Sequence, residues 1–275
     1  MVTNQKVAVV TGSSSGIGRE ISFILARNGF ITYATMRNLQ KGSGIKTILE
    51  SEKLPLYIVQ LDVTDDFSVR DAIKTIYDEI GKIDVLVNNA GYGLTGAFED
   101  LTIDEIKKQY ETNVFGLIRT TQAVLPIMRK QKSGLIVNIS SGVGRFGYPT
   151  GSAYVSTKFA VEGLSESMSY EIEPFGIKVI LIEPGVIKTN FFNASVLAKK
   201  AQNPNSPYAP LIKGMKESLN KMIENGSTPQ DVAQIVISAI KDENPKLRYL
   251  VGKDVEQLVE AKKKMSDEEF HNMIK

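Results

Sequence analysis

The sequence begins with an apolar segment that runs directly into a glycine-rich loop. Residues 6–10 read Lys-Val-Ala-Val-Val, which is typical of a buried strand. Residues 11–18 read Thr-Gly-Ser-Ser-Ser-Gly-Ile-Gly, and a helical pattern follows as far as Asn28. This order suits a dinucleotide site, because glycines let the backbone approach a pyrophosphate and the helix N-terminus attracts the anion. The spacing is Gly-x-x-x-Gly-x-Gly, not the usual Gly-x-Gly-x-x-Gly, and an ordinary strand-to-helix loop is the alternative.

Segments of strand character alternate with segments of helical character along most of the chain. Many are continuous apolar runs, such as residues 135–139, as is typical of a parallel sheet with helices on both faces. The expected strands are 7–11, 31–36, 56–61, 85–88, 135–140, 178–183 and 248–251, and the expected helices are 17–28, 67–80, 103–130, 153–175 and 229–241. We expect an α/β fold, a Rossmann-type doubly wound parallel sheet of about seven strands, in one domain spanning residues 1–275.

Two segments depart from this alternation. Residues 190–228 hold three prolines and two glycines, so we expect an insertion with one or two short helices. It is either a lid over the site or a plain connection. Residues 254–275 are charged, and we expect a C-terminal helical extension there.

Composition excludes several classes of protein. The chain has no cysteine and a single histidine, His271, so we expect no metal site, and the charged neighbours of His271 favour a surface role. The net charge of +2 and the absence of a basic, aromatic patch argue against a nucleic-acid partner. No apolar run approaches the roughly 18 residues of a membrane span. The first strand leaves no room for a signal peptide, so we expect a cytoplasmic protein.

Tyr154 and Lys158 are spaced to lie on one helix face, one turn apart. A free tyrosine has a pKa of about 10 and is a poor acid or base near neutral pH. A neighbouring ammonium favours the phenolate, so we expect Lys158 to lower the pKa of Tyr154. The pair is then suited to proton transfer at an alcohol or a carbonyl. By itself, Tyr-x-x-x-Lys is also common on solvated helix faces.

Three motifs in register resemble the short-chain dehydrogenase/reductase family. They are the glycine loop at residues 11–18, Asn-Asn-Ala-Gly at residues 88–91, and Tyr154-x-x-x-Lys158. The resemblance extends strongly over residues 5–190 and loosely beyond. It implies an oxidoreductase that interconverts a ketone or aldehyde and an alcohol by hydride transfer, with a nicotinamide dinucleotide as cofactor.

The resemblance also assigns a catalytic set. Tyr154 is the general acid or base, and Lys158 also holds the nicotinamide ribose. The family's serine precedes the tyrosine by thirteen residues, which favours Ser141 over the adjacent Ser140; its hydroxyl can donate to the substrate oxygen. Asn113 matches the family's helix asparagine, which positions a water that connects the lysine with solvent.

Further residues are implied to bind the dinucleotide. Asp62-Val63 resembles the pair that meets the adenine, residues 88–91 lie along the adenosine half, and Pro184–Thr189 holds the carboxamide through Ile187 and Thr189. As alternatives, Asp62 is a helix cap and Pro184-Gly185 a turn. The cofactor set is Gly12, Ser13, Ser15, Gly16, Ile17, Gly18, Arg37, Asp62, Val63, Asn89, Ala90, Gly91, Tyr154, Lys158, Pro184, Gly185, Ile187 and Thr189.

The end of the second expected strand predicts which dinucleotide is preferred. An acid there would bind the adenosine ribose of NAD, but the sequence has Met36 followed by Arg37. A guanidinium can bind a 2′-phosphate in bidentate fashion, and Ser13 could add a hydrogen bond. We therefore expect a preference for NADP(H), with NAD(H) use or a merely solvated Arg37 as alternatives.

The substrate is the least constrained prediction. Expected lining residues are mostly apolar, and core positions are the alternative for many of them: Tyr92, Leu94, Val143, Phe146, Tyr148, Phe191 and Phe192, with Arg145 as a charged neighbour. The segment 33–38 resembles family members that act on steroids and retinoids, which suggests an apolar substrate. A nucleotide-sugar epimerase and a non-catalytic nucleotide sensor are the rival functions. The family also implies a homodimer or homotetramer, in which Glu111, Phe115, Ala160 and Leu164 could face a partner.

Overall fold

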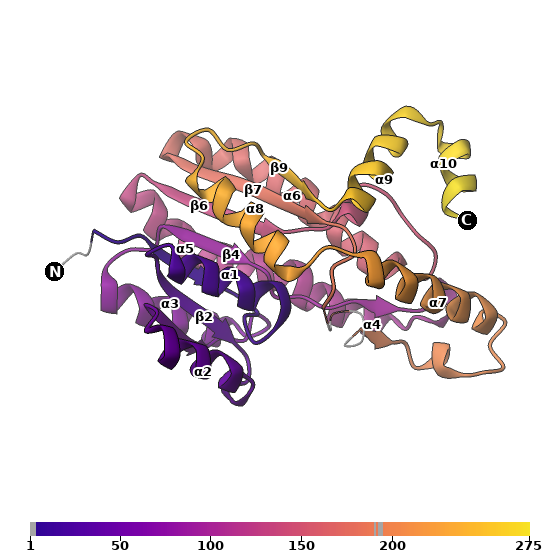
Figure 1. Ribbon diagram of the computed structural model, residues 1–275, viewed down its shortest axis with the longest axis horizontal. Coiled ribbons are helices and arrows are strands. Elements are labelled where there is room, and N and C mark those ends of the chain that lie inside the picture. Colours follow the sequence, from indigo (N-terminus) through magenta and orange to yellow (C-terminus); the bar gives the residue numbers. More distant parts are fainter. Residues whose placement is uncertain (1–3, 190, 192–194) are drawn as a thin grey trace.

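A seven-stranded parallel sheet forms the centre of the computed structural model, which describes residues 4–189, 191 and 195–275 (Figure 1). The strand order is β3-β2-β1-β4-β6-β7-β9. Successive strands are added on one side of β1 up to β3 and on its other side from β4 onward, so the strand order reverses between β1 and β4. The strands are β1 Val7–Val10, β2 Ile31–Met36, β3 Leu56–Gln60, β4 Val85–Asn88, β6 Gly134–Ile139, β7 Ile177–Pro184 and β9 Arg248–Val251. The expected Rossmann-type fold is confirmed, and each predicted strand is found to within one residue at either end.

Helices cover both faces of this sheet because the strand residues alternate between two cores. Ala8 and Val10 pack toward α1 and α8, whereas Val7 and Val9 pack toward α3 and α5. All four side chains are fully buried, as expected for a strand inside a parallel sheet. The helices are α1 Gly16–Arg27, α2 Ser43–Glu52, α3 Asp66–Ile80, α4 Ile103–Tyr110, α5 Gly116–Gln131, α6 Ser152–Ile172, α7 Ala209–Asn225, α8 Pro229–Lys241, α9 Lys253–Lys264 and α10 Asp267–Ile274.

Shorter elements join these helices and strands. The 3₁₀ turns are η1 Leu39–Gly42, η2 Phe98–Asp100, η4 Gly142–Gly144, η5 Glu173–Phe175 and η6 Lys200–Gln202, and η3 Glu111–Phe115 is a π-helical turn. The two-residue strands β5 Leu94–Thr95 and β8 Val196–Leu197 pair in parallel. This pairing attaches the inserted segment 190–228 to the chain that follows β4.

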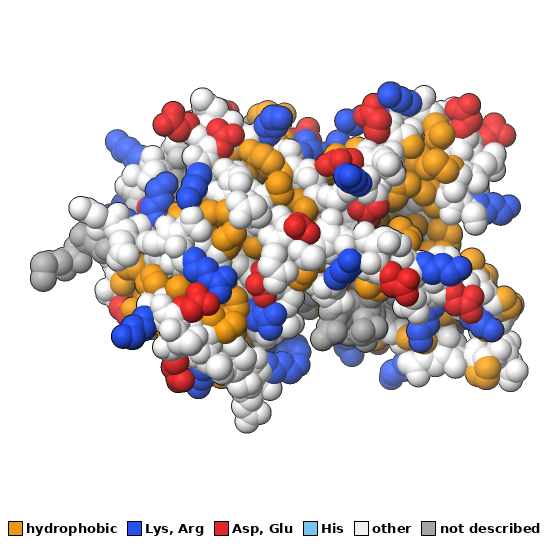
Figure 2. Space-filling view, viewed as in Figure 1, with side chains coloured by type: hydrophobic (Ala, Val, Ile, Leu, Met, Phe, Trp, Pro, Cys, Tyr) orange, Lys and Arg blue, Asp and Glu red, His pale blue; other side chains and the backbone are white. Residues whose placement is uncertain are grey.

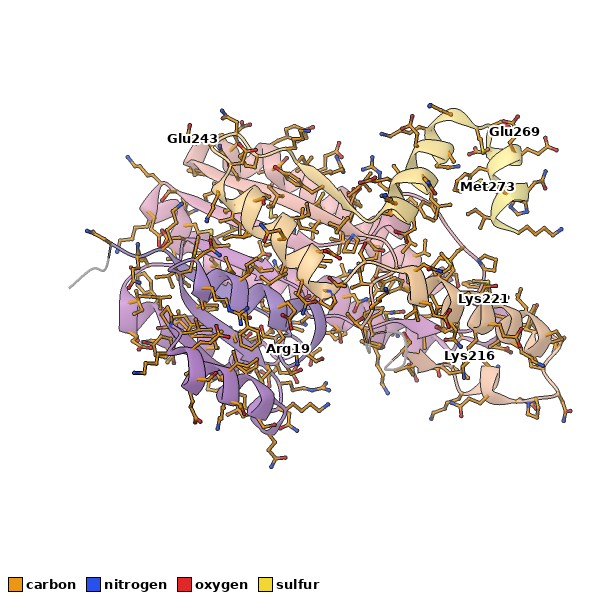
Figure 3. All side chains as sticks on the ribbon, in the orientation of Figure 1. Arg19, Lys216, Lys221, Glu243, Glu269 and Met273 are labelled. Atoms are coloured by element: carbon orange, nitrogen blue, oxygen red, sulfur yellow. The ribbon has the colours of Figure 1, made fainter. Side chains whose placement is uncertain are left out.

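Two arms extend beyond the carboxyl ends of the strands. One is α7, which has no buried residue and carries Lys216 and Lys221 on its surface (Figure 3). The other is the pair α9 and α10 at the C-terminus (Figure 1). At 17 residues, α7 is longer than the short helices expected for residues 190–228. No helix in the described part of the chain is long and apolar enough to span a membrane.

The helix predictions needed three corrections. The single helix expected over 103–130 is divided into α4, η3 and α5 by the π-helical turn. Helix α2 was not expected at all, and only Ile45 of its ten residues is buried. The C-terminal extension forms two helices, because Ser266 and Glu269 make a capping box that starts α10.

Candidate active site

A cavity of about 330 Å³ lies at the carboxyl ends of the strands, at the point where the strand order reverses. This is the position at which open α/β sheets bind their ligands. Its lining combines the glycine loop, the segment after β4, the loop after β6, the face of α6 and the segment after β7. The lining residues are Gly12, Ser14, Ser15, Gly16, Ile17, Asn89, Ala90, Gly91, Tyr92, Ile139, Ser140, Ser141, Tyr154, Lys158, Pro184, Gly185, Ile187, Thr189 and Phe191.

The glycine loop requires its glycines for two different reasons. Gly12 and Gly16 have φ angles of +67° and +59°, a region that favours glycine. Gly18 has no such angle, but a Cβ there would lie 2.3 Å from Asn89 Nδ2. The loop therefore combines a sharp turn with close contact to the segment after β4.

Thr11 and Asn89 fix that contact with hydrogen bonds. The backbone amides of Asn89 and Ala90 donate to Thr11 Oγ1 at 3.0 and 3.1 Å. In return, Asn89 Nδ2 donates to the carbonyl oxygens of Thr11 and Gly12 at 2.9 and 3.1 Å. The two predicted cofactor segments thus form one rigid wall of the cavity.

Asn113 lies in the π-helical turn and connects this wall to α6. Its Oδ1 accepts from the amide of Tyr92 at 3.1 Å, and its Nδ2 donates to the Tyr92 carbonyl at 2.9 Å. The same Nδ2 also donates to Thr157 Oγ1 at 3.3 Å. π-helical turns recur at functional sites. Here the turn places the buried side-chain amide of Asn113 where it bonds both Tyr92 and α6, the helix that carries Tyr154.

The structure brings Tyr154, Lys158 and Ser141 together at the cavity wall. Lys158 Nζ lies 5.6 Å from the centroid of the Tyr154 ring and donates to the Ile139 carbonyl at 2.8 Å. The Ser141 hydroxyl donates to the Pro184 carbonyl at 3.2 Å and also hydrogen-bonds with Tyr154. The Phe191 ring covers Tyr154, with the ring centroids 5.8 Å apart.

The pKa of Tyr154 departs from the expectation. Burial raises the pKa above its ordinary value, the charge of Tyr148 raises it further, and the hydrogen bond with Ser141 acts in the opposite direction. Burial also lowers the pKa of Lys158 to about 8, against the influence of Glu162. The expected lowering of the Tyr154 pKa by Lys158 is not found, because desolvation is the largest influence on this group. The hydroxyl of Tyr154 therefore stays protonated at neutral pH.

Ser140 and Ser141 both reach the cavity, but with different partners. Ser141 is the N-cap of η4, and its hydroxyl is engaged with Pro184 and Tyr154. Ser140 is 3% exposed, and its hydroxyl has no hydrogen-bond partner within the described residues. The geometry therefore places Ser141, not Ser140, beside the tyrosine.

Arg37 and Ser13, the residues expected to select the dinucleotide, differ in their exposure. Arg37 is exposed, and its guanidinium makes no ion pair with residues of the described ranges; Met36 is buried. Ser13, however, is fully buried, and its hydroxyl donates to the Val10 carbonyl at 2.8 Å. The hydrogen bond expected from Ser13 to a phosphate is thus corrected: Ser14 and Ser15 line the cavity instead.

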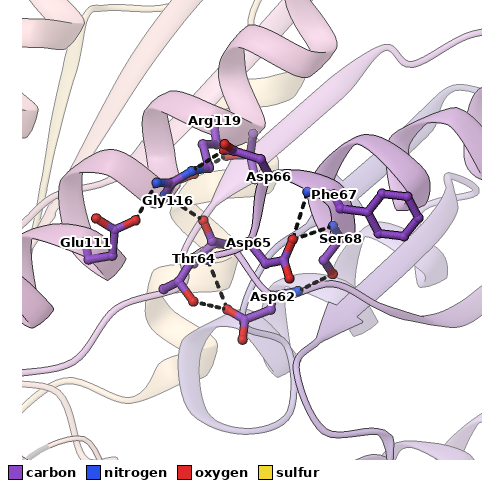
Figure 4. Close-up of polar contacts among 11 residues, drawn as sticks. Asp62, Thr64, Asp65, Asp66, Phe67, Ser68, Glu111, Gly116 and Arg119 are labelled. Carbon is purple, nitrogen blue, oxygen red and sulfur yellow. Dashed lines mark hydrogen bonds and ion pairs between the residues drawn. The ribbon is translucent and has the colours of Figure 1, made fainter.

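Asp62 belongs to a cluster of polar contacts that follows β3 (Figure 4). Asp62 Oδ1 accepts from the amide and hydroxyl of Thr64 at 3.0 and 2.8 Å, which closes a turn after β3. The alternative of a helix cap is wrong for Asp62, because the N-cap of α3 is Asp65. Neither Asp62 nor Val63 is among the residues lining the cavity.

The segment after β7 is tied to the C-terminal arm. Asp254 Oδ2 accepts from the Val186 amide at 2.8 Å, and a Cβ on Gly185 would lie 2.4 Å from the same carboxylate. Thr189 Oγ1 accepts from the amide of Phe191 at 3.2 Å. These contacts hold Pro184–Thr189 against the cavity, opposite the glycine loop.

The residues expected to contact substrate separate into three groups. Tyr92 and Phe191 line the cavity, whereas Leu94 is 2% exposed and belongs to the core. Phe146 and Tyr148 line a second cavity of about 480 Å³ that is closed by α10. Figure 2 shows hydrophobic side chains gathered on the inner side of this C-terminal arm. Phe192 lies outside the described residues.

Sequence reasoning missed Ser14 and Ile139. Ser14 sits between two residues that were named, and only the left-handed turn at Gly12 decides which serine faces the cavity. Ile139 is the last residue of β6, so its place at a strand end could have identified it.

A nicotinamide dinucleotide fits the residues that are present. The backbone of Gly12 and Gly16 lines the cavity, and the loop leads into the N-terminus of α1, which favours an anion. Tyr154 and Lys158 lie on another wall of the same cavity. The site thus combines a binding surface for pyrophosphate with a protonated phenol beside a lysine.

Comparisons with known proteins agree with this geometry. A family model described as short chain dehydrogenase matches residues 6–200. A 3-ketodihydrosphingosine reductase from Bacteroides thetaiotaomicron is 38% identical, with 92% of this chain and 90% of that protein covered. Retinol dehydrogenase 8 from Homo sapiens is 34% identical, with 90% and 82% covered. The chain therefore belongs to the short-chain dehydrogenase/reductase family and is an oxidoreductase.

Solved structures show the same fold. A short-chain dehydrogenase from Streptomyces avermitilis has a TM-score of 0.83 and 34% identity, covering 94% of this chain and 92% of the other. An alcohol dehydrogenase from Thermococcus sibiricus, complexed with 5-hydroxy-NADP, has a TM-score of 0.75 and 26% identity, covering 90% and 97%.

Proposed function

We propose that the protein is an NADP(H)-dependent oxidoreductase that interconverts an apolar ketone or aldehyde with the corresponding alcohol. The observation that carries this proposal is the position of Tyr154, beside Ser141 and Lys158, on the wall of the cavity that the glycine loop also lines. A family relationship alone would leave open whether the chemistry is retained. The complete set of proton donor, lysine and serine supports an enzyme over a non-catalytic nucleotide sensor.

In the direction of reduction, the chain's own residues manage the proton. The bound dinucleotide supplies the hydride. The Ser141 hydroxyl turns from the Pro184 carbonyl to donate a hydrogen bond to the substrate oxygen. Tyr154, protonated at neutral pH because burial raises its pKa, donates the proton. The ammonium of Lys158 then stabilises the phenolate that remains. Asn113 keeps the Tyr92 segment and α6 in register, so these groups stay aligned.

A preference for NADP(H) is supported by the end of β2. The exposed guanidinium of Arg37 is not neutralised by an acid of the described ranges, and no acid stands in the place of Met36. The Thermococcus sibiricus relative with 5-hydroxy-NADP adds to this support. In this proposal Ser14 and Ser15, not Ser13, line the cavity alongside the glycine backbone.

An apolar substrate is supported by the aromatic side chains near Tyr154. Tyr92 and Phe191 line the cavity. Tyr148 lies close enough to Tyr154 to affect its pKa and lines the second cavity beneath α10. The relatives named for a ketosphingoid and for retinol are in keeping with such a substrate. Assembly through α5 and α6 is part of the same proposal, because Phe115 and Phe159 are each 47% exposed.

The proposal is tested first with Tyr154→Phe. We expect turnover of NADPH with an accepted ketone to fall at least about a hundredfold, because the proton donor is removed. NADPH affinity, measured by fluorescence titration, should change little. Tyr170→Phe is the matched control, since Tyr170 is 70% exposed on the same helix. Full turnover by Tyr154→Phe would refute the assignment, and binding without turnover of any carbonyl by the unmodified protein would favour a sensor.

The cofactor preference is tested with Arg37→Ala. We expect kcat/KM for NADPH to fall about tenfold or more, because a charge-assisted contact to phosphate is lost. The value for NADH should be nearly unchanged. Arg70→Ala, an exposed arginine on α3, is the control. Equal use of NADPH and NADH by the unmodified protein would contradict the preference.

A further inference from the structure

A cluster of four charged side chains includes one residue of α6, the helix that carries Tyr154 and Lys158. It joins Arg145 after η4, Glu162 on α6, Glu183 on β7 and Arg248 on β9. Arg248 Nε lies 2.9 Å from Glu162 Oε2 and 3.5 Å from Glu183 Oε1. Arg145 Nη1 lies 3.2 Å from Glu183 Oε1 and 3.8 Å from Glu162 Oε2. Each arginine thus faces both carboxylates.

Both carboxylates of this cluster are unusually buried. Glu183 is 1% exposed and Glu162 is 6% exposed. Burying a carboxylate is costly unless its oxygens are bonded. Yet Glu162 Oε1 has no hydrogen-bond partner within the described residues. The arginines therefore hold Glu162 through Oε2, while Oε1 is left without a hydrogen bond among the described residues.

Three of the four members, Glu162, Arg145 and Glu183, adjoin a residue of the proposed active site. Glu162 follows Lys158 by one turn of α6. Arg145 ends the turn that Ser141 starts, and a Cβ on Gly144 within that turn would lie 2.9 Å from Glu162 Cγ. Glu183 precedes Pro184, whose carbonyl accepts from Ser141. The cluster thus fastens three active-site segments to one another.

We propose that Glu162 is a positioning residue that keeps Lys158 in its cationic form, with Glu183, Arg145 and Arg248 holding its carboxylate in place. Burial disfavours the charge of Lys158, and Glu162 is the acidic group that acts against this. The ammonium is needed because it is the charge that stabilises the phenolate of Tyr154. This inference rests on the proposed role of Lys158, and Glu162 itself touches neither substrate nor cofactor.

The charged and titratable groups around Glu162 define the electrostatic balance. Arg248 faces it from β9, Arg145 from the loop after β6, and Glu183 from β7. Lys158 and Glu166 flank it on α6, and Glu166 binds Arg248 from the solvent side with a side chain that is 46% exposed. The buried Glu183 carries a pKa raised to about 7, mainly by burial and by Glu162. Of the two buried acids in this cluster, Glu162 is the one that shares a helix with Lys158, four residues further along α6.

The test measures the titration of Lys158 directly in the full-length protein without dinucleotide. Competitive labelling with acetic anhydride, followed by mass spectrometry, gives the pH midpoint at which the Lys158 amine becomes reactive. In Glu162→Gln we expect this midpoint to fall by roughly one pH unit, because a neighbouring opposite charge is removed. In Arg145→Gln we expect it to rise, because the negative charge at Glu162 is less neutralised. The second variant keeps the test decisive if Glu162→Gln does not fold.

Controls separate a positional role from a general loss of structure. Glu162→Asp keeps the charge and should restore most of the midpoint, and Glu166→Gln should leave it unchanged. The inference is overturned if Glu162→Gln titrates like the unmodified protein, if Glu166→Gln shifts equally, or if Arg145→Gln lowers the midpoint. Carbonyl reduction is measured in parallel. A shifted midpoint in a protein that reduces no carbonyl would refute the proposed function and leave the inference standing; normal reduction with an unshifted midpoint would do the reverse.

Discussion

Gly18 is the residue at which the glycine loop and the segment after β4 come closest. A Cβ at this position would lie 2.3 Å from Asn89 Nδ2 and 2.7 Å from the Gly12 carbonyl oxygen. The side-chain amide of Asn89 already donates to the Thr11 and Gly12 carbonyls, so this side chain cannot move without breaking both bonds. Gly18 is therefore required because it leaves room for the Asn89 side chain, and not because of its backbone angles.

We predict that Gly18→Ala weakens NADPH binding at least about tenfold and lowers the free energy of unfolding by about 1–3 kcal/mol, as overpacking does in a tight site. Fluorescence titration and urea denaturation measure the two effects. Gly214→Ala on α7 is the control, because nothing lies within 4 Å of a Cβ there and alanine favours a helix. Unchanged affinity in Gly18→Ala would show that the loop can relax.

At the residue scale, the sequence predicts which segments form the cavity better than which atoms face it. The glycine spacing indicated the loop, but the turn at Gly12 points Ser13 inward and Ser14 outward. The same limit applies to the pKa of Tyr154. Spacing places Lys158 beside the ring of Tyr154. The burial of that ring depends instead on residues outside α6, such as Phe191 after β7 and Tyr148 before α6.

At the scale of elements, Arg119 joins the loop after β3 to the π-helical turn. Its guanidinium forms ion pairs with Asp66 and Glu111 and donates to the Val63 carbonyl at 3.2 Å (Figure 4). Gly116 allows this approach, because a Cβ there would lie 2.7 Å from Val63 Cγ2. One side chain on α5 thus connects the segment proposed to meet the adenine with the turn that carries Asn113.

We predict that Arg119→Gln lowers the free energy of unfolding by about 1 kcal/mol, a magnitude set by the partial exposure of both ion pairs. Weaker fixation of Val63 and Asn113 should also raise the dissociation constant of NADPH, by up to about fivefold. Lys74→Gln, which removes an exposed pair with Asp78 on α3, serves as the control. If both variants behaved alike in NADPH titration, Arg119 would have no special link to the cofactor site.

Strands were easier to predict than helices because they are buried on both faces. Apolar runs mark β1, β4 and β6, and every residue of β1 and β4 is buried. The only polar residue of these two strands is Asn88, at the carboxyl end of β4. Helices α2 and α7 bury one residue and none, so neither contributes much to the core that the apolar strands mark. The π-helical turn Glu111–Phe115 is defined by its backbone hydrogen bonds, which the residue types alone do not predict.

At the scale of the whole molecule, the C-terminal arm encloses space next to the proposed active site. Phe270 on α10 is 5% exposed and packs edge-on against Phe146, with the ring centroids 5.7 Å apart. Together with Tyr148 and Ile274, these rings line the second cavity. Helix α9 meanwhile packs Val255 against Gly142 and binds Val186 through Asp254, so the arm is anchored at both active-site loops. An apolar substrate that extends past Tyr148 would enter this space.

We predict that Phe270→Ala raises KM about tenfold for a long-chain or polycyclic ketone, because loss of about 1.4 kcal/mol of apolar contact has that effect. A short ketone such as butanone should show no change, since it would not reach beyond Tyr148. NADPH affinity should also be unaffected, because the lining of the first cavity includes no residue of the arm. Phe67→Ala on α3, where the ring is 71% exposed, is the matched control. An equal rise in KM for short and long ketones would mean that α10 supports the fold of the site without contacting substrate. An unchanged KM for every ketone would place the substrate entirely on the side of Tyr92 and Phe191.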